Sequence, residues 1–160
     1  MYRRETSEQL SFTEFYLPFG GRLNGKNRWI QLAELIPWEE FEEEYAQHFS
    51  ANDMGAPAKS FRMALGSELI KQRLSLSDEE VVEQIRENPY LQYFIGLENY
   101  RDAAPFDPSM MTHFRQRLGL DLIQRVNERV LAEEHKKKEP KNQSKAIEKK
   151  EVLKTVGNFC

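Results

Sequence analysis

Residues 59–97 read KSFRMALGSELIKQRLSLSDEEVVEQIRENPYLQYFIGL and contain three helical patterns in succession. Over about 59–74 the apolar side chains fall on more than one side, which is typical of a helix at the centre of a bundle. The next helix is predicted to begin at Ser77, because a glutamate three residues later completes a capping box. Asn88-Pro89 ends that helix, since proline disfavours helical backbone in the residue before it. The apolar run that follows is predicted to form a short helix or turn in the core.

Further helices are predicted on both sides of this region, at 27–36, 37–49, 107–119 and 121–136. Pro37 suits the first turn of its helix, where a backbone N–H is not needed. The apolar face of that helix is formed by Phe41, Tyr45 and Phe49. An Asp-Pro pair opens the third of these helices, and Gly119 is placed to close it. The predicted fold class is all-α, a multi-helix bundle.

The composition fits one domain with a tail. Of the 160 residues, 39% are apolar, 31% are charged and 11% are aromatic, which is too aromatic for a disordered chain. The longest charge-free apolar stretch, 90–97, is far shorter than the roughly 20 residues that a membrane span needs. The N-terminus MYRRETSEQL lacks the apolar segment of a signal peptide, and the single cysteine, Cys160, excludes an internal disulfide. We expect a soluble, cytoplasmic protein with no membrane partner.

The net charge of −3 is unevenly distributed along the chain. Residues 1–53 carry −5, residues 54–135 carry −3 and residues 136–160 carry +5. This distribution excludes a uniformly basic nucleic-acid binder, but it allows basic residues on one helix and along a tail. We predict a helical domain over 1–135 and a charged Lys/Glu-rich linker or disordered tail over 136–160.

No group of residues in the sequence predicts catalysis. The acidic residues gather at 39–44 and 78–80, in helical first turns or on polar faces, where solvation and the helix dipole explain them. The three histidines, His48, His113 and His135, have no cysteine or serine partner at a recognisable spacing. The sequence contains neither a Walker A loop nor a glycine-rich dinucleotide fingerprint. We therefore expect no enzymatic activity, no metal and no cofactor.

One predicted helix, over 109–118, carries the groups that suit recognition of DNA. At about 100° per residue, its apolar arc is formed by Met110, Met111, Phe114 and Leu118. The candidate DNA contacts lie off this arc and are Ser109, Thr112, His113, Arg115, Gln116 and Arg117. Hydroxyl and amide groups read base edges in the major groove, while guanidinium groups hold phosphates. A solvated amphipathic helix explains the same pattern, so the spacing alone does not decide between the two interpretations.

A longer, ordered series of motifs resembles one protein family. The motifs are LPFGGRL (17–23), NRWIQLAELIPWEEFEEEYA (27–46), GAPAKSF to YFIGL (55–97) and PFDPSMMTHFRQRLG (105–119). They are similar to the N-terminal domain of InsH-like insertion-sequence transposases of the DDE class. The resemblance implies a helix-turn-helix-like module that binds the terminal repeats of an insertion element as double-stranded DNA. On this resemblance, the polar residues of 109–117 become its candidate DNA contacts.

The chain also departs from the family pattern at two places. The family often has Gly-Arg-Pro where this chain has Gly55-Ala56-Pro57, which lacks the basic side chain. The family continues past the charged linker into a strand that bears the first catalytic aspartate, and 142–160 offers no such strand. In the family, three carboxylates on the sheet of the catalytic domain would hold the two metal ions that cleave the DNA strand. The resemblance therefore implies a truncated transposase that binds element ends but lacks the catalytic domain.

A helical protein–protein interaction module, without direct DNA readout, is the alternative function. The same domain of a full-length transposase is suited to dimerisation, and the acidic helix 37–49 favours a protein partner over DNA. The expected partners are thus double-stranded DNA, a second copy of the chain or an intact transposase. A titration with DNA at two salt concentrations separates the two functions. Binding through phosphate contacts releases counterions and should weaken steeply with salt, whereas helix–helix association should not.

Overall fold

The computed structural model describes residues 2, 10–49 and 58–157, of which 139–157 are described as backbone only. These residues form six helices and no strand. The helices are α1 (Arg28–Leu35), α2 (Trp38–Ala46), α3 (Phe61–Leu74), α4 (Asp78–Glu87), α5 (Pro89–Phe94) and α6 (Met110–Gly157). The predicted all-α fold is therefore confirmed. The segments 3–9 and 55–57 and Cys160, which entered three of the expectations, lie outside the described residues.

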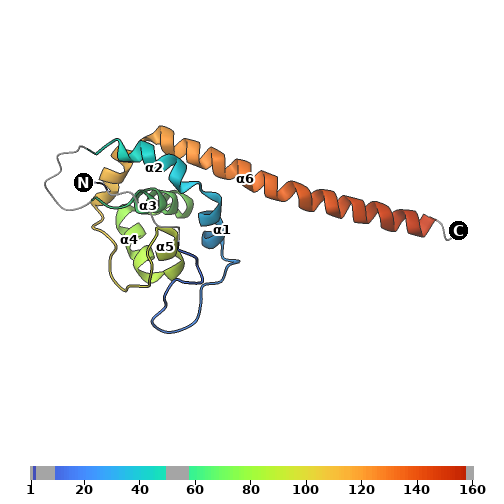
Figure 1. Ribbon diagram of the computed structural model, residues 1–160, viewed down its shortest axis with the longest axis horizontal. Helices are drawn as coiled ribbons and strands as arrows, with labels where there is room; N and C mark the ends of the chain where they lie inside the picture. The colour runs from blue at the N-terminus through green and yellow to red at the C-terminus, as the bar shows by residue number, and fades with distance from the viewer. Residues whose placement is uncertain (1, 3–9, 50–57, 158–160) are drawn as a thin grey trace.

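Helix α3 forms the centre of the body, as its apolar pattern predicts. It contacts α2, α4, α5 and α6, and the other helices surround it in Figure 1. Nine of its fourteen residues are buried, including Gly66, whose missing side chain leaves room for Ile95 of the segment after α5. The helix begins at Ser60, whose side chain accepts a hydrogen bond from the Met63 N–H. It ends at Ser75, which has left-handed backbone angles.

Helices α4 and α5 begin where the capping residues predict. The Ser77 hydroxyl accepts a hydrogen bond from the Glu80 N–H at the start of α4. Asn88 ends α4 and also caps α5, because its side chain accepts a hydrogen bond from the Tyr90 N–H. Helix α5 is short, and its residues Leu91 and Phe94 are buried, so the expected apolar helix does fill the core.

Helix α2 is shorter than the apolar spacing predicts. It ends at Ala46, and Phe49 lies beyond it in a turn rather than on a third helical turn. The aromatic spacing still has a structural meaning, because the rings of Tyr45 and Phe49 pack with their centroids 5.3 Å apart. No helix within the described ranges combines the length and the apolar character that crossing a membrane requires.

Helix α6 consists of two helices joined at Gly119, the residue predicted to close the first of them. Gly119 has φ 71° and ψ 153°, a conformation that is open essentially only to glycine. Beyond this kink the second part crosses the body and then extends away from it (Figure 1). Its backbone stays helical to Gly157, through the segment expected to be a linker or disordered tail. The division of the chain after residue 135 remains a prediction.

Candidate nucleic-acid interface

The first turns of α6 present a polar face to solvent. Ser109, Thr112, His113 and Gln116 are exposed there. On the opposite side Met111, Phe114 and Leu118 are buried, while Met110 is half-buried at the margin. The Asp107 carboxylate accepts a hydrogen bond of 2.9 Å from the Ser109 N–H at the start of this helix, and hydrogen bonding to Ser109 lowers the pKa of that carboxyl. The predicted apolar and polar sides of the helix are therefore present.

Arg115 is directed inward to two carboxylates rather than outward. Its Nη1 lies 3.2 Å from Glu68 Oε1 of α3 and 2.8 Å from Asp78 Oδ1 of α4. Its Nη2 donates to Asp78 Oδ2 at 3.0 Å, so the guanidinium holds Asp78 with both of its amino groups. Arg115 therefore joins the start of α6 to α3 and α4. Helical periodicity does not indicate this role, because the two carboxylates lie 47 and 37 residues before the arginine.

The three charges around Arg115 differ in their surroundings. Glu68 is buried, with 3% of its side chain exposed, and this burial raises the pKa of its carboxyl against the opposing effect of Arg115. Hydrogen bonding from Arg115 lowers the pKa of Asp78 to about 2, with Lys71 adding a second hydrogen bond of 2.6 Å. Asp78 is thus ionised at neutral pH and holds both cations.

Arg117 also packs against the body. Its guanidinium carbon lies 4.7 Å from the centroid of the Phe49 ring, a cation–π contact. Its Nη1 is buried and has no hydrogen-bond partner among the described residues, and the same holds for the Tyr45 hydroxyl. Burial raises the pKa of Tyr45, and the neighbouring Arg117 charge opposes this rise. The two arginines thus lie against the body, whereas Ser109, Thr112, His113 and Gln116 face solvent together.

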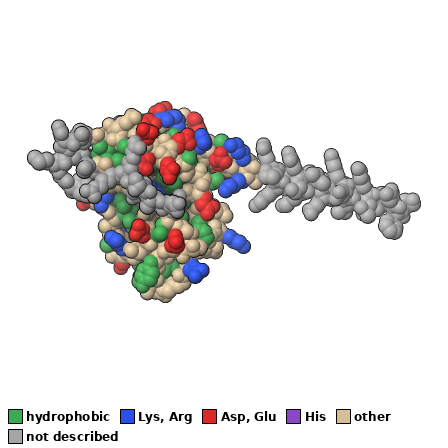
Figure 2. All heavy atoms as spheres, viewed as in Figure 1, with side chains coloured by type: hydrophobic (Ala, Val, Ile, Leu, Met, Phe, Trp, Pro, Cys, Tyr) green, Lys and Arg blue, Asp and Glu red, His purple; other side chains and the backbone are tan. Residues whose placement is uncertain are grey.

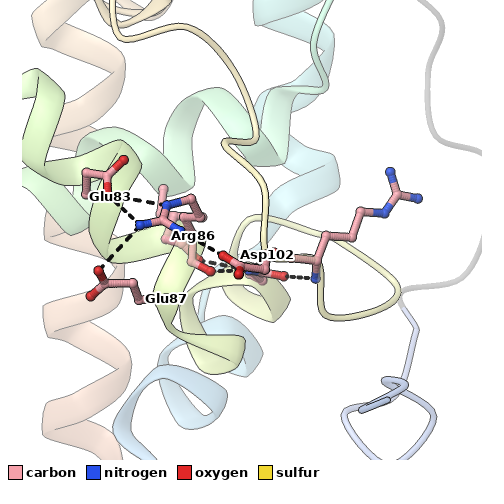
Figure 3. A network of polar contacts seen from close by, with 7 residues as sticks. Glu83, Arg86, Glu87 and Asp102 are labelled. Atoms are coloured by element: carbon pink, nitrogen blue, oxygen red, sulfur yellow. Dashed lines mark hydrogen bonds and ion pairs between the residues drawn. The ribbon is translucent and has the colours of Figure 1, made fainter. Parts of the chain in front are cut away.

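Helix α4 presents an acidic face, which argues against it as a DNA-reading helix. Only the three residues 75–77 separate it from α3, a length typical of helix-turn-helix pairs. Its exposed side chains are Glu79, Glu80, Glu83 and Glu87, which repel phosphate. Figure 3 shows that its arginine, Arg86, points to carboxylates, with Glu83 at 2.8 Å and Asp102 at 2.7 Å. A groove-binding role therefore suits the start of α6 better than α4.

The acidic helix α2 is partly neutralised within the chain. Glu44 accepts hydrogen bonds of 2.6 and 2.7 Å from Arg125, and Glu40 lies 3.3 Å from Arg129, both on the second part of α6. Acidic and basic side chains are correspondingly interspersed over this part of the surface in Figure 2. Helix α2, whose acidic residues favoured a protein partner in the sequence analysis, thus uses two of its carboxylates to bind α6 of the same chain.

The acidic residues do not converge on a metal site in the described part of the chain. No group of three or more histidine, cysteine, aspartate or glutamate residues with the placement needed to hold a metal ion occurs there. Among the carboxylates at 39–44 and 78–80, Glu40, Glu44 and Asp78 pair with arginine or lysine, and Glu42 accepts a hydrogen bond from the Tyr2 hydroxyl. The others are exposed on helix surfaces.

Comparison with known proteins identifies related sequences. A family model described as a transposase domain (DUF772) matches residues 18–117, a range that contains all six candidate residues of α6 and its start. A curated protein of Rhizobium meliloti, described as uncharacterized protein ORF8 in the nfe locus, is 40% identical over 97 residues. These residues are 61% of this chain and 46% of that protein, so the chain spans about half the length of this relative. No solved structure matches the chain.

Proposed function

The chain belongs to the transposase-domain family DUF772, and from this membership we propose that it is a DNA-binding module in transposition. In this role the first turns of α6 lie in the major groove at the ends of an insertion element. We assign recognition, and no catalytic step, to the described residues.

The observation that carries the proposal is the exposed face of Ser109, Thr112, His113 and Gln116. Hydroxyl, imidazole and amide groups can donate to and accept from base edges, and all four face solvent on the same short helix. The helix is held in place, because Arg115 joins it to α3 and α4. A fixed helix loses little conformational entropy on binding, which favours precise contacts with bases.

Arg115 has a different role here from the one its position in the sequence implies. With two carboxylates already bound, it acts as a positioning residue for the helix rather than as a contact to phosphate. Substitution of Arg115 is then expected to affect DNA binding through the fold, whereas Thr112 and Gln116 act at the bases directly.

The test is a titration of two labelled duplexes with the purified chain, at two salt concentrations. One duplex carries the ends of the insertion element that encodes the chain, and the other has the same composition in scrambled order. We expect tighter binding to the element ends, and weaker binding to both duplexes at higher salt.

Variants of two glutamines of α6 separate the loss of a base contact from the loss of an exposed amide elsewhere on the helix. Gln116→Ala, alone or with Thr112→Ala, is expected to reduce the preference for element ends by about 5- to 150-fold per lost base contact. Gln124→Ala removes an equally exposed amide from the second part of α6 and is expected to leave the preference unchanged. Equal binding of both duplexes by the parent chain, together with salt-independent self-association, would instead favour the protein–protein module.

A further inference from the structure

A small pocket opens where the start of α1 meets the end of α3. Its volume is about 180 Å³, and it is lined by Arg28, Trp29, Leu32, Arg73 and Leu74. Two arginines from different helices therefore border one space. In Figure 1, α1 lies at the other end of the body from the first turns of α6, so the pocket is separate from the proposed DNA-reading face.

Neither arginine of the pocket has a carboxylate partner among the described residues. Arg28 lies over the ring of Trp29, with its guanidinium carbon 5.5 Å from the ring centroid, and makes no ion pair there. Arg73 likewise has no ion pair, whereas Lys71 in the same helical turn is bound to Asp78. The first turn of α1 contains no acidic residue, so this helix supplies no carboxylate of its own at its positive end. The local charge favours an anion.

The lining of the pocket points to an organic phosphate as this anion. The oxygens of a phosphate point in different directions, so guanidinium groups from two helices can bind it at once. A planar carboxylate is satisfied by a single guanidinium, so two arginines from different helices favour a phosphate over a carboxylate. Leu32 and Leu74 supply apolar contacts for the carbon atoms of a sugar.

We propose that this pocket binds the phosphate of a sugar–phosphate, either in the backbone of DNA or in a free nucleotide. The site adds to the proposed function and does not depend on the face of α6. Phosphate contacts carry no base sequence information, so the pocket contributes affinity and salt dependence rather than discrimination. This difference allows the two sites to be tested separately.

The first experiment uses thymidine 5′-monophosphate as the probe and follows the indole N–H signal of Trp29 by NMR. We expect the nucleotide to shift this signal, and thymidine, which lacks the phosphate, to leave it in place. Arg28→Gln and Arg73→Gln are each expected to abolish the shift. The side chains of both arginines are exposed and make no hydrogen bond among the described residues, so these variants are expected to keep the parent's far-UV circular dichroism.

The second experiment uses a random-sequence duplex and measures affinity as a function of salt. Each pocket variant is expected to lower the salt slope by about one if the pocket holds a backbone phosphate. Arg22→Gln is the matched control, because it removes one exposed positive charge that lies outside the pocket lining. It is expected to leave the nucleotide-dependent shift of Trp29 unchanged.

The outcomes are distinct from those of the test on α6. A pocket-dependent effect on the duplex supports the proposal with DNA as the source of the phosphate, and a pocket-dependent effect on the nucleotide alone supports it with a free nucleotide. If Arg28→Gln and Arg73→Gln match Arg22→Gln in both experiments, the pocket binds no phosphate. The preference for element ends is expected to survive both pocket variants, so failure at this pocket leaves the face of α6 untouched.

Discussion

Glu68 of α3 is buried, and Arg115 is the cation that stabilises its ionised carboxylate. We expect Arg115→Ala to reduce the free energy of unfolding by about 2 kcal/mol at pH 7. This is less than the loss for a fully buried ion pair, because about a third of the Arg115 side chain is exposed. Without the guanidinium, the pKa of Glu68 rises further and the loss shrinks as the pH falls. Urea unfolding at pH 7 and pH 5 measures both effects.

Two further variants identify the cause of that loss. Adding Glu68→Gln to Arg115→Ala removes the uncompensated charge and is expected to restore part of the stability. Gln116→Ala, the exposed neighbour of Arg115, is expected to change the stability little. If Arg115→Ala is as stable as Gln116→Ala, the ion pairs seen at Arg115 do not contribute to the fold.

Asp78 gives the fold a pH dependence of known sign. Its pKa is lowered to about 2 from the ordinary value of 3.8, so its contribution is present above about pH 4 and is lost as the pH falls through about 2. We expect Asp78→Asn to cost about 1 kcal/mol at pH 7, less than the full shift implies, because water reaches the carboxylate and screens it. The difference from the parent is expected to shrink as the pH falls toward 2 and to vanish below it, in thermal unfolding followed by circular dichroism.

Glu79→Gln is the control for that experiment. Glu79 lies in the same first turn of α4 and is exposed, so its loss reports on the helix dipole without the ion pairs. A pH dependence that Glu79→Gln alters as strongly as Asp78→Asn would contradict the role of Arg115 and Lys71.

For single residues of the candidate site, the sequence predicts exposure to solvent well. It predicts the contacts that each side chain makes less well. The helical spacing placed Thr112, His113 and Gln116 on the exposed side, and the structure agrees. The partners of Arg115 were not predictable, because periodicity reports which face a side chain lies on and not which distant residue it meets. The proximity of Arg73 to α1 was not predictable for the same reason, since the pocket that it lines is formed with residues of α1.

At the scale of the elements, Gly119 sets the direction of α6 after its first turns. We expect Gly119→Ala to destabilise the fold by about 1–3 kcal/mol, because alanine rarely adopts φ 71° and ψ 153°. No atom lies within 4 Å of an added Cβ, so the cost comes from the backbone alone. The measurement is the midpoint of urea unfolding.

The neighbouring Leu120 provides a control for the kink. Its side chain is 85% exposed, so Leu120→Ala is expected to leave the midpoint unchanged. If Gly119→Ala instead keeps or raises the stability, α6 tolerates a continuous helix at this position and the kink does not determine the placement of its first turns.

The helix ends were predictable because they depend on local chemistry. Ser77, Asn88 and Gly119 act through groups within three residues of themselves, and each ends or begins a helix as predicted. The end of α2 was not predictable from its apolar spacing. Phe49 contacts Tyr45 and Arg117 from a turn, so burial there does not require a helix.

Across the described part of the chain, ion pairs occupy several of the arginines. The net charge is −3, and the arginines Arg86, Arg115, Arg125 and Arg129 are all bound to carboxylates of the same chain. Arg125 and Arg129 lie on the second part of α6 and hold Glu44 and Glu40 of α2. If the chain binds DNA as proposed, this pairing is expected to weaken its non-specific binding to phosphates, an effect that the net charge alone does not reveal.

We expect Glu40→Gln with Glu44→Gln to strengthen binding to a random-sequence duplex. The double variant frees Arg129 and removes one of the two carboxylates bound to Arg125, which keeps Asp121 at 3.0 Å, so its salt slope is expected to rise by about one. The side chains of these ion pairs are 41–50% exposed, so the pairs stabilise the fold little and the variant is expected to stay folded. Glu34→Gln with Glu79→Gln is the matched control, because it removes the same charge from two exposed glutamates without an ion pair among the described residues. Fluorescence anisotropy of the labelled duplex at several salt concentrations compares the two variants, and equal salt slopes would mean that net charge, rather than the freed arginines, controls the binding.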